Sequence, residues 1–373
     1  MTARRGGPGR PHRAPRRIAL AVGLCLAALV AGCEAGAQPR ERIRVSLPTS
    51  STAFWSDSEA YYMPTSKPED GLREAPWQGG TYGYVRDANT RSGVRVHTRF
   101  HEGMDVAPRF RDRDGEPLDT VVAISDGRVV YVNHDARASN YGRYVVVEHR
   151  WQGSPYYSLY AHLDAAWVYP SQYVRERAPL GRLGYTGTGI DRRRAHVHAE
   201  VNLYLSDGFD AWLARYHPRQ VNEHGRWNGQ NLSAFDIVAF YRALDADPDL
   251  DLGAWIRSHQ PVAFTVVVPG RVTLDLVRRY PWLLVGDATG EAPPAYEIAF
   301  AGSGLPLSVT PREVGTATPF VLQVSPRVRY QGAPTNGLLA KRGDAYDLST
   351  KGREYVALVS RAAPTVGYGS FGD

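Results

Sequence analysis

Between residues 77 and 205, apolar residues come in short runs that are separated by turn residues. The segment "TVVAISDGRVVYVNHD" has the pattern of a strand, an Asp-Gly turn and a second strand. Further strands are predicted at "GRYVVVEHR", "YYSLYAHL", "LGRLGYTGTG", which runs into a glycine-rich loop, and "AHVHAEVNLYL". Short strands at this spacing predict a mainly β domain, built as a curled antiparallel sheet or sandwich.

The pattern changes after residue 215. Apolar residues recur at helical spacing in "SAFDIVAFYRAL", with Ser233 as the expected N-cap, and "DLGAWIRSHQ" predicts a second short helix. From Pro261 the segments "AFTVVV", "WLLVG", "YEIAFAG", "FVLQVS" and "YVALVS" have the composition of strands. We therefore expect an α+β extension, made of a connecting helical segment (216–260) and a small β-rich module of unknown role (261–373).

The positive charge of the chain lies at its start. Residues 1–32 contain six arginines and no acidic residue, which equals the formal net charge of +6 for all 373 residues. The remainder is formally neutral, so composition gives no support for a nucleic-acid partner. An apolar run follows at 18–32, shorter than the roughly 20 residues that a membrane-spanning helix needs. Its length fits the core of a signal peptide, so we expect the protein to be exported.

The run ends in "LVAGC", with Ala31 and Gly32 directly before Cys33. This resembles the bacterial lipobox, which implies a lipoprotein signal peptide over 1–32 and a lipid anchor on Cys33 in the cell envelope. Because Glu34 follows that cysteine in place of an aspartate, the outer membrane is slightly favoured if there are two membranes. The alternative is an ordinary cleavage site near "AGA". Residues 33–76 are expected to begin as a tether, and their later aromatic residues to pack on the following domain.

Candidate chemistry lies in three histidine-containing segments. In "AHVHAEV", His196 and His198 share one face of a strand, roughly 6 to 7 Å apart. In "RFHEGMDVAP", His101 and Asp105 supply a nitrogen and an oxygen that suit Zn²⁺, and Gly103 between them lets the backbone bring the two together. In "YSLYAHLD", His162 stands in an apolar strand, where a single histidine is usually a core residue.

The segments "HEGMD", "YAHL" and "HVHAE", in this order, resemble the motifs of the LytM/lysostaphin-type zinc metallopeptidases, the M23 peptidase family. The resemblance covers about residues 80–205 and implies a catalytic domain over 77–215 with a duplicated-hybrid-motif-like fold. It also implies one Zn²⁺ held by His101, Asp105 and His198, with His162 and His196 as catalytic residues. How the two catalytic histidines divide their roles stays open. The chain departs from the family at Ala199, where relatives usually carry a bulky aromatic residue.

The implied function is zinc-dependent hydrolysis of peptide bonds in bacterial cell-wall peptidoglycan, with its peptides as substrate. The alternative is a silent or self-inhibited relative that serves as an activator or scaffold for cell-wall amidases, although relatives of that kind lose ligands and this chain keeps all five positions. The C-terminal module could bind a cell-envelope protein or a glycan, or it could be a structural extension. The arginine run 192–194 has two interpretations, either a lining of the substrate groove or a solvated surface.

Overall fold

A computed structural model describes residues 40–65, 75–91, 94–286, 292–326 and 336–362, without the side chains of 87–98. These residues belong to one compact unit that begins at Arg40. The predicted signal peptide and Cys33 lie outside the described residues. Among the residues that the structure describes, no helix is both long and apolar enough to cross a bilayer. The boundaries predicted at 76, 215 and 260 fall inside this unit and stay predictions.

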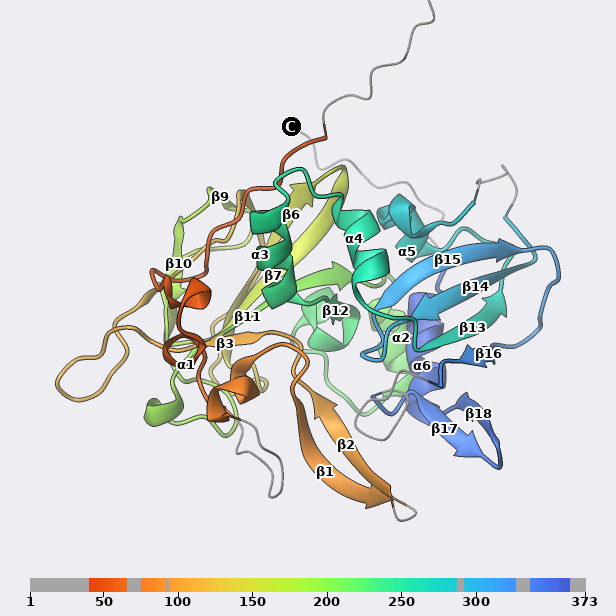
Figure 1. The fold of residues 1–373 in the computed structure, drawn as a ribbon, viewed down its shortest axis with the longest axis horizontal. Helices are drawn as coiled ribbons and strands as arrows, with labels where there is room; N and C mark the ends of the chain where they lie inside the picture. Colours follow the sequence, from red (N-terminus) through yellow and green to blue (C-terminus); the bar gives the residue numbers. More distant parts are fainter. Residues whose placement is uncertain (1–39, 66–74, 92–93, 287–291, 327–335, 363–373) are drawn as a thin grey trace, which may run out of the picture. The chain divides into compact units, whose positions relative to one another are not determined.

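The largest sheet is antiparallel, and its strand order is β12-β11-β7-β6-β5-β9, with β3 as an additional partner of β11 (Figure 1). The strands are β3 (Met104–Val106), β5 (Gly127–Asn133), β6 (Arg143–Trp151), β7 (Ser154–Leu163), β9 (Tyr173–Val174), β11 (Val197–Tyr204) and β12 (Leu232–Ala234). Every residue of β7 and β11 is buried, so both faces of the sheet are covered where these strands pair. The prediction of a mainly β, antiparallel fold is confirmed.

The tight β6–β7 hairpin follows from its two turn residues. Gln152 and Gly153 both have positive φ angles, 51° and 80°, as a two-residue turn of type I′ requires. The Asp-Gly turn predicted between the two preceding strands, in contrast, does not join a hairpin. Strand β4 (Thr120–Val122) pairs with β10 (Pro179–Arg182) in a three-stranded sheet with β8 (Ala165–Ala166), whereas β5 belongs to the large sheet. Residues 126 and 127 therefore connect two sheets and do not close a hairpin.

The N-terminal segment packs on the large sheet over the described part of the range 33–76. The side chains of Phe54, Tyr61 and Tyr62 are buried, as expected for the later part of that range, and Trp55 is half exposed. These residues lie around the short helices η1 (Ala53–Trp55) and α1 (Ser58–Tyr61). The earlier part is also ordered by backbone contacts, since the amide of Ser46 donates to the carbonyl of Ile124. The hairpin β1 (Val85–Arg91) and β2 (Val94–Phe100) follows, and Figure 1 shows it projecting from the unit.

The C-terminal region contains both predicted helices, and the first of them begins later than predicted. Helix α3 (Ile237–Ala246) is capped by Asp236, whose carboxylate accepts from the amide of Ala239, and Ser233 lies in β12 instead of capping it. Helix α4 (Leu252–His259) is confirmed, with Asp251 as its cap. Helix α2 (Phe209–Tyr216) was not predicted.

The predicted small β module has an antiparallel sheet in the order β15-β14-β13-β16 and a separate hairpin, β17–β18. The strands are β13 (Phe264–Pro269), β14 (Ala295–Phe300), β15 (Pro306–Arg312), β16 (Phe320–Val324), β17 (Leu339–Arg342) and β18 (Ala345–Leu348). Helix α5 (Asp275–Arg279) lies between β13 and β14 in the sequence. The three segments "AFTVVV", "YEIAFAG" and "FVLQVS" are confirmed as strands.

Two predicted strands of this module are wrong. The segment "WLLVG" forms the short helix η6 (Pro281–Leu283) and then a single bridge from Leu284 to Val309. The segment "YVALVS" lies in helix α6 (Thr350–Val359). Ser349 caps this helix, because its hydroxyl accepts from the amide of Gly352. Burial of Val356 and Val359 on one helix face outweighs the strand preference of β-branched residues.

Candidate metal centre

The register of strand β11 against β3 brings two distant motifs together. His198 lies directly opposite Asp105 in this antiparallel pair, so their side chains leave the sheet as close neighbours. Gly103 makes the approach possible, because a Cβ atom there would lie 2.5 Å from the carbonyl oxygen of Ala199 and 2.9 Å from Cε1 of His198. This glycine has no positive φ angle, so its role is to leave space and not, as predicted, to let the backbone turn.

His101, Asp105 and His198 present three ligand atoms to one point. Nε2 of His101 lies 2.9 Å from Oδ1 of Asp105 and 3.1 Å from Nδ1 of His198, and the third side of this triangle, Nδ1 of His198 to Oδ1 of Asp105, is 2.8 Å. All three side chains are buried. A tetrahedral zinc ion with bonds of about 2.0 Å separates its ligands by roughly 3.3 Å, so the triangle is close to the size that zinc needs.

The outer partners of the two histidines decide which nitrogens face inward. Nδ1 of His101 lies 2.8 Å from the carbonyl oxygen of Thr81, and Nε2 of His198 lies 2.7 Å from Oε1 of Glu200. Since a carbonyl or carboxylate oxygen can only accept, each outer nitrogen carries a proton and leaves the inner nitrogen as an acceptor. Three buried acceptors that face one another require a positive charge between them. The donor set therefore fits a zinc ion.

Glu200 extends the site beyond the three candidate ligands. Its Oε1 also accepts from the Tyr141 hydroxyl at 2.8 Å, and its Oε2 accepts from the Asn202 amide at 2.9 Å. Carboxylates that accept from the outer nitrogen of a ligand histidine fix its orientation and strengthen it as a ligand. The second oxygen of Asp105 is held in a similar way by the hydroxyl of Thr65 at 2.5 Å and by Arg86 at 3.4 Å.

His162 and His196 border the triangle from one side. Their rings lie 4.7 Å apart, and the His162 ring lies 5.9 Å from that of His198. Nδ1 of His162 contacts the Thr186 carbonyl at 2.9 Å and Nδ1 of His196 contacts the Arg194 carbonyl at 2.6 Å, so Nε2 of each ring remains an acceptor.

The position of His162 depends on a distortion of strand β7. Its φ angle is +62°, which is rare for a residue with a side chain, and the β6–β7 register shifts between Arg143 and Val145. A bulge of this kind re-aims a side chain that a regular strand would direct elsewhere.

Burial and charge separate the pKa values of the histidines. Burial lowers the pKa of His198, but hydrogen bonds to Asp105 and Glu200 outweigh it and raise the pKa to about 10, so that without a metal a proton on this ring supplies the positive charge between the inward-facing atoms. Burial lowers the pKa of His196 and holds that of His162 well below its usual value. Burial would raise the pKa of Asp105, but the neighbouring histidines hold it well below its ordinary value. At neutral pH, His162 and His196 are therefore uncharged and able to accept a proton.

The five residues line a cavity of about 1000 Å³ together with residues of the loop 220–230 and of the C-terminal region. Of the three arginines at 192–194, Arg194 lines this cavity, whereas Arg192 pairs with Glu116 and Arg193 with Asp191. Arg194 thus agrees with the interpretation as a lining of the groove, and Arg192 and Arg193 agree with the interpretation as a solvated surface.

The structure gathers all five residues predicted from the motifs. Their roles as ligands and catalysts stay predictions. No role was predicted for Glu200, Tyr141, Thr65 or Arg86. For Glu200 a signal existed, since it ends the "HVHAE" segment and lies on the same strand face as His198. Thr65 and Arg86 carry no local signal.

Residues 99–208 match the model for Peptidase family M23. Relatives include the murein hydrolase activator NlpD of Salmonella dublin, 33% identical over 101 residues, and that of Escherichia coli strain K12, 32% identical, each covering 27% of this chain. The chain spans about a fifth of these relatives' own length, 22% in both cases. The matched segment lies within the predicted domain 77–215, so the chain contains an M23-type peptidase domain.

Solved structures also resemble part of the chain. A zinc-containing peptidase from Vibrio cholerae is 27% identical, with a TM-score of 0.22, and the match covers 33% of this chain and 36% of that one. The catalytic domain of lysostaphin from Staphylococcus simulans is 20% identical, with a TM-score of 0.26, and the match covers 45% of this chain and 98% of that one.

Proposed function

We propose that this protein is a zinc-dependent endopeptidase that hydrolyses peptide bonds of bacterial cell-wall peptidoglycan. The observation that carries the proposal is the convergence of His101, Asp105 and His198 at the wall of a large cavity, with His162 and His196 beside them. The M23 match supports the reaction class, and the murein-related names of the relatives support the substrate.

The proposed chemistry needs three protein ligands and two bases. A zinc ion held by His101, Asp105 and His198 would acidify water and polarise a carbonyl group. Nε2 of His196 or of His162 would take a proton from the attacking water and return one to the leaving amine. Both rings are held in the required tautomer by backbone carbonyls, those of Thr186 and Arg194. Asp105 would offset only one of the two charges of a bound Zn²⁺, and the remaining positive charge would favour the developing oxyanion.

Location forms part of the same proposal. The predicted signal peptide and lipid anchor on Cys33 would export the protein and hold it at a membrane of the cell envelope, where peptidoglycan is within reach. The outer membrane remains slightly favoured if two membranes exist, and nucleic acid is not among the proposed partners.

The test uses the chain from residue 33 onward, loaded with one equivalent of zinc and incubated with purified wall sacculi. We expect release of soluble peptides that mass spectrometry assigns to one cleaved bond. The variant His198→Ala should lose both zinc and turnover, whereas His196→Ala should keep zinc and lose turnover by about 100-fold or more. The exposed His134 supplies a matched control, because His134→Ala should change neither.

The second candidate is an activator of wall hydrolases, and the name of the curated relatives favours it. Zinc binding without peptide release, together with stimulation of an added wall amidase, would select it over the endopeptidase. Release of peptides that His196→Ala abolishes would exclude a purely activating role.

A further inference from the structure

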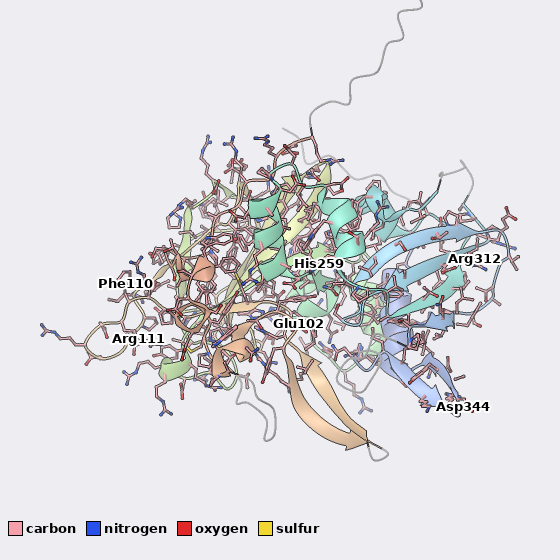
Figure 2. The ribbon with its side chains drawn as sticks, in the orientation of Figure 1. Glu102, Phe110, Arg111, His259, Arg312 and Asp344 are labelled. Atoms are coloured by element: carbon pink, nitrogen blue, oxygen red, sulfur yellow. The ribbon has the colours of Figure 1, made fainter. Side chains whose placement is uncertain are left out.

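A second, smaller pocket opens beside the metal cavity. Its volume is about 400 Å³, and it shares several lining residues with the larger cavity, among them Phe100, Glu102, Tyr141 and Lys351. Glu102 follows the ligand His101 directly, so the pocket begins one residue from the metal centre. Figure 2 shows Glu102 near the base of the β1–β2 hairpin, between the large sheet and the C-terminal region.

Helix α6 is held in the wall of this pocket by two hydrogen bonds to its neighbours. The indole nitrogen of Trp212 on α2 donates to the backbone carbonyl of Glu354 on α6 at 2.7 Å. The hydroxyl of Tyr355 on α6 donates to the carbonyl of Gly304, between β14 and β15, at 2.9 Å. Both contacts use backbone carbonyls and fix this wall of the pocket within the fold.

Four aromatic rings and two carboxylates contribute to the pocket lining. Phe100, Tyr141, Trp212 and Tyr355 supply four rings, and Glu102 and Glu354 supply two carboxylates. The side chain of Glu102 forms no hydrogen bond or ion pair with the side chain of another described residue, and its surroundings and the charge of Glu200 raise its pKa to about 7.

The charged groups of the lining are the two carboxylates, the imidazole of His217 and the ammonium of Lys351. Glu354 has His217 as a partner at 3.6 Å, and Lys351 donates to the carbonyl of Asn336 at 2.9 Å. Glu102 is therefore the carboxylate of the lining that has no side-chain partner among the described residues.

We infer that this pocket binds a cationic side chain of the peptide whose backbone lies at the metal centre. Two carboxylates attract an ammonium group, and aromatic faces bind cations in a site that is partly shielded from water. The pocket also continues the proposed active-site cavity, so one extended peptide reaches both. The inference rests on the proposed function for the identity of the ligand as a peptide substrate.

The experiment measures binding, so that it does not depend on turnover. Zinc-loaded protein with the substitution His196→Ala is titrated by calorimetry with three N-acetylated alanine pentapeptide amides, whose central residue is lysine, norleucine or glutamate. We expect the lysine peptide to bind about tenfold more tightly than the norleucine peptide, and the glutamate peptide to bind least. In the further double variant Glu102→Gln, Glu354→Gln, the preference for lysine should fall to about twofold or less.

The control is Glu313→Gln, which removes an exposed carboxylate of the C-terminal module outside the pocket and should leave the preference unchanged. Equal affinities for lysine and norleucine, tighter binding of the glutamate peptide, or no binding of any peptide would overturn the inference. Failure of the proposed function appears separately, as absence of peptide release from sacculi by the unsubstituted protein. A lysine preference that depends on the two glutamates would stand in either case.

Discussion

Glu200 shows how one side chain outside the ligand set can control the centre. It accepts hydrogen bonds from His198, Tyr141 and Asn202, and it is itself buried. Its negative charge lies behind the ligand nitrogen of His198, where it strengthens that nitrogen as a donor to a cation and fixes the ring orientation.

The variant Glu200→Gln therefore tests the centre at the scale of one residue. Glutamine keeps the shape and an acceptor oxygen but removes the charge, so we expect the zinc dissociation constant to rise by about 10- to 100-fold, measured by competition with a chelator. The circular dichroism spectrum should not change. In β6, Glu148→Gln is the matched control, because Glu148 accepts from Tyr157 and pairs with Arg150 elsewhere on the sheet. Equal zinc affinities in both variants would refute the role of Glu200.

His149 predicts a pH dependence of stability that is independent of the metal centre. It is fully buried, its ring nitrogens contact the Asp126 carbonyl and the Ser158 hydroxyl, and its ring stacks on Trp151. Burial lowers its pKa from 6.5 to about 4. The unfolded chain therefore binds a proton there at a higher pH than the folded protein, so the stabilisation is complete above pH 6.5 and is lost as the pH falls towards 4.

The expected loss from this group between pH 7 and pH 4 is about 3 kcal/mol of unfolding free energy, measured by urea denaturation. In His149→Gln this part of the pH dependence should be absent, although the variant is less stable at pH 7. His134→Gln removes an exposed histidine and should retain the full dependence. A slope in His149→Gln as steep as in the unsubstituted protein would show that other groups cause it.

At the scale of elements, the pairing of β3 with β11 creates the site. Strand β3 has only three residues, and its close approach depends on the missing side chain at Gly103. A substitution at this position therefore acts on the whole strand pair and not only on one contact.

We expect Gly103→Ala to cost about 2 kcal/mol of unfolding free energy and to weaken zinc binding by about tenfold. The new methyl group would stand 2.5 Å from the Ala199 carbonyl oxygen, so β3 must move away from β11 and carry Asp105 with it. Urea denaturation and zinc titration measure the two effects. In the control Gly315→Ala, at an exposed position, the nearest atom is Cβ of Pro294 at 3.3 Å, which a small shift relieves, and both quantities should change little.

The elements also show what the sequence could and could not predict. The five motif residues could be found because each motif is short and its internal order is fixed by the chain. The partners Thr65 and Arg86 could not, since their contacts with Asp105 depend on how separate segments pack. Helix α6 was predicted as a strand because its apolar residues are β-branched in part, and only the tertiary burial of one face decides for the helix.

At the scale of the whole molecule, the described residues that precede the M23 match belong to the fold. Phe54 is buried and its ring lies 5.5 Å from that of Tyr241 in helix α3, which is almost 190 residues away in the sequence. The N-terminal segment thus connects the large sheet to the helices that follow it. A fragment that begins at residue 77 would lack these contacts.

The variant Phe54→Ala tests this integration. Loss of a buried aromatic ring should cost about 3 kcal/mol of unfolding free energy in guanidinium denaturation. The adjacent Trp55 is half exposed, so Trp55→Ala should cost less than about 1 kcal/mol. Similar small losses in both variants would mean that the segment contributes little to the stability of the unit.

The central claim is that His101, Asp105 and His198 together bind one zinc ion. X-ray absorption at the zinc edge of the loaded protein tests it most directly, alongside the metal content per chain. If these three residues hold the ion, the spectrum shows one zinc with two imidazole nitrogens and oxygen ligands at about 2.0 to 2.1 Å, and one imidazole fewer in any zinc that His101→Ala retains. A protein that retains no zinc, or imidazole scattering that His101→Ala leaves unchanged, would show that the ion is not held in this way.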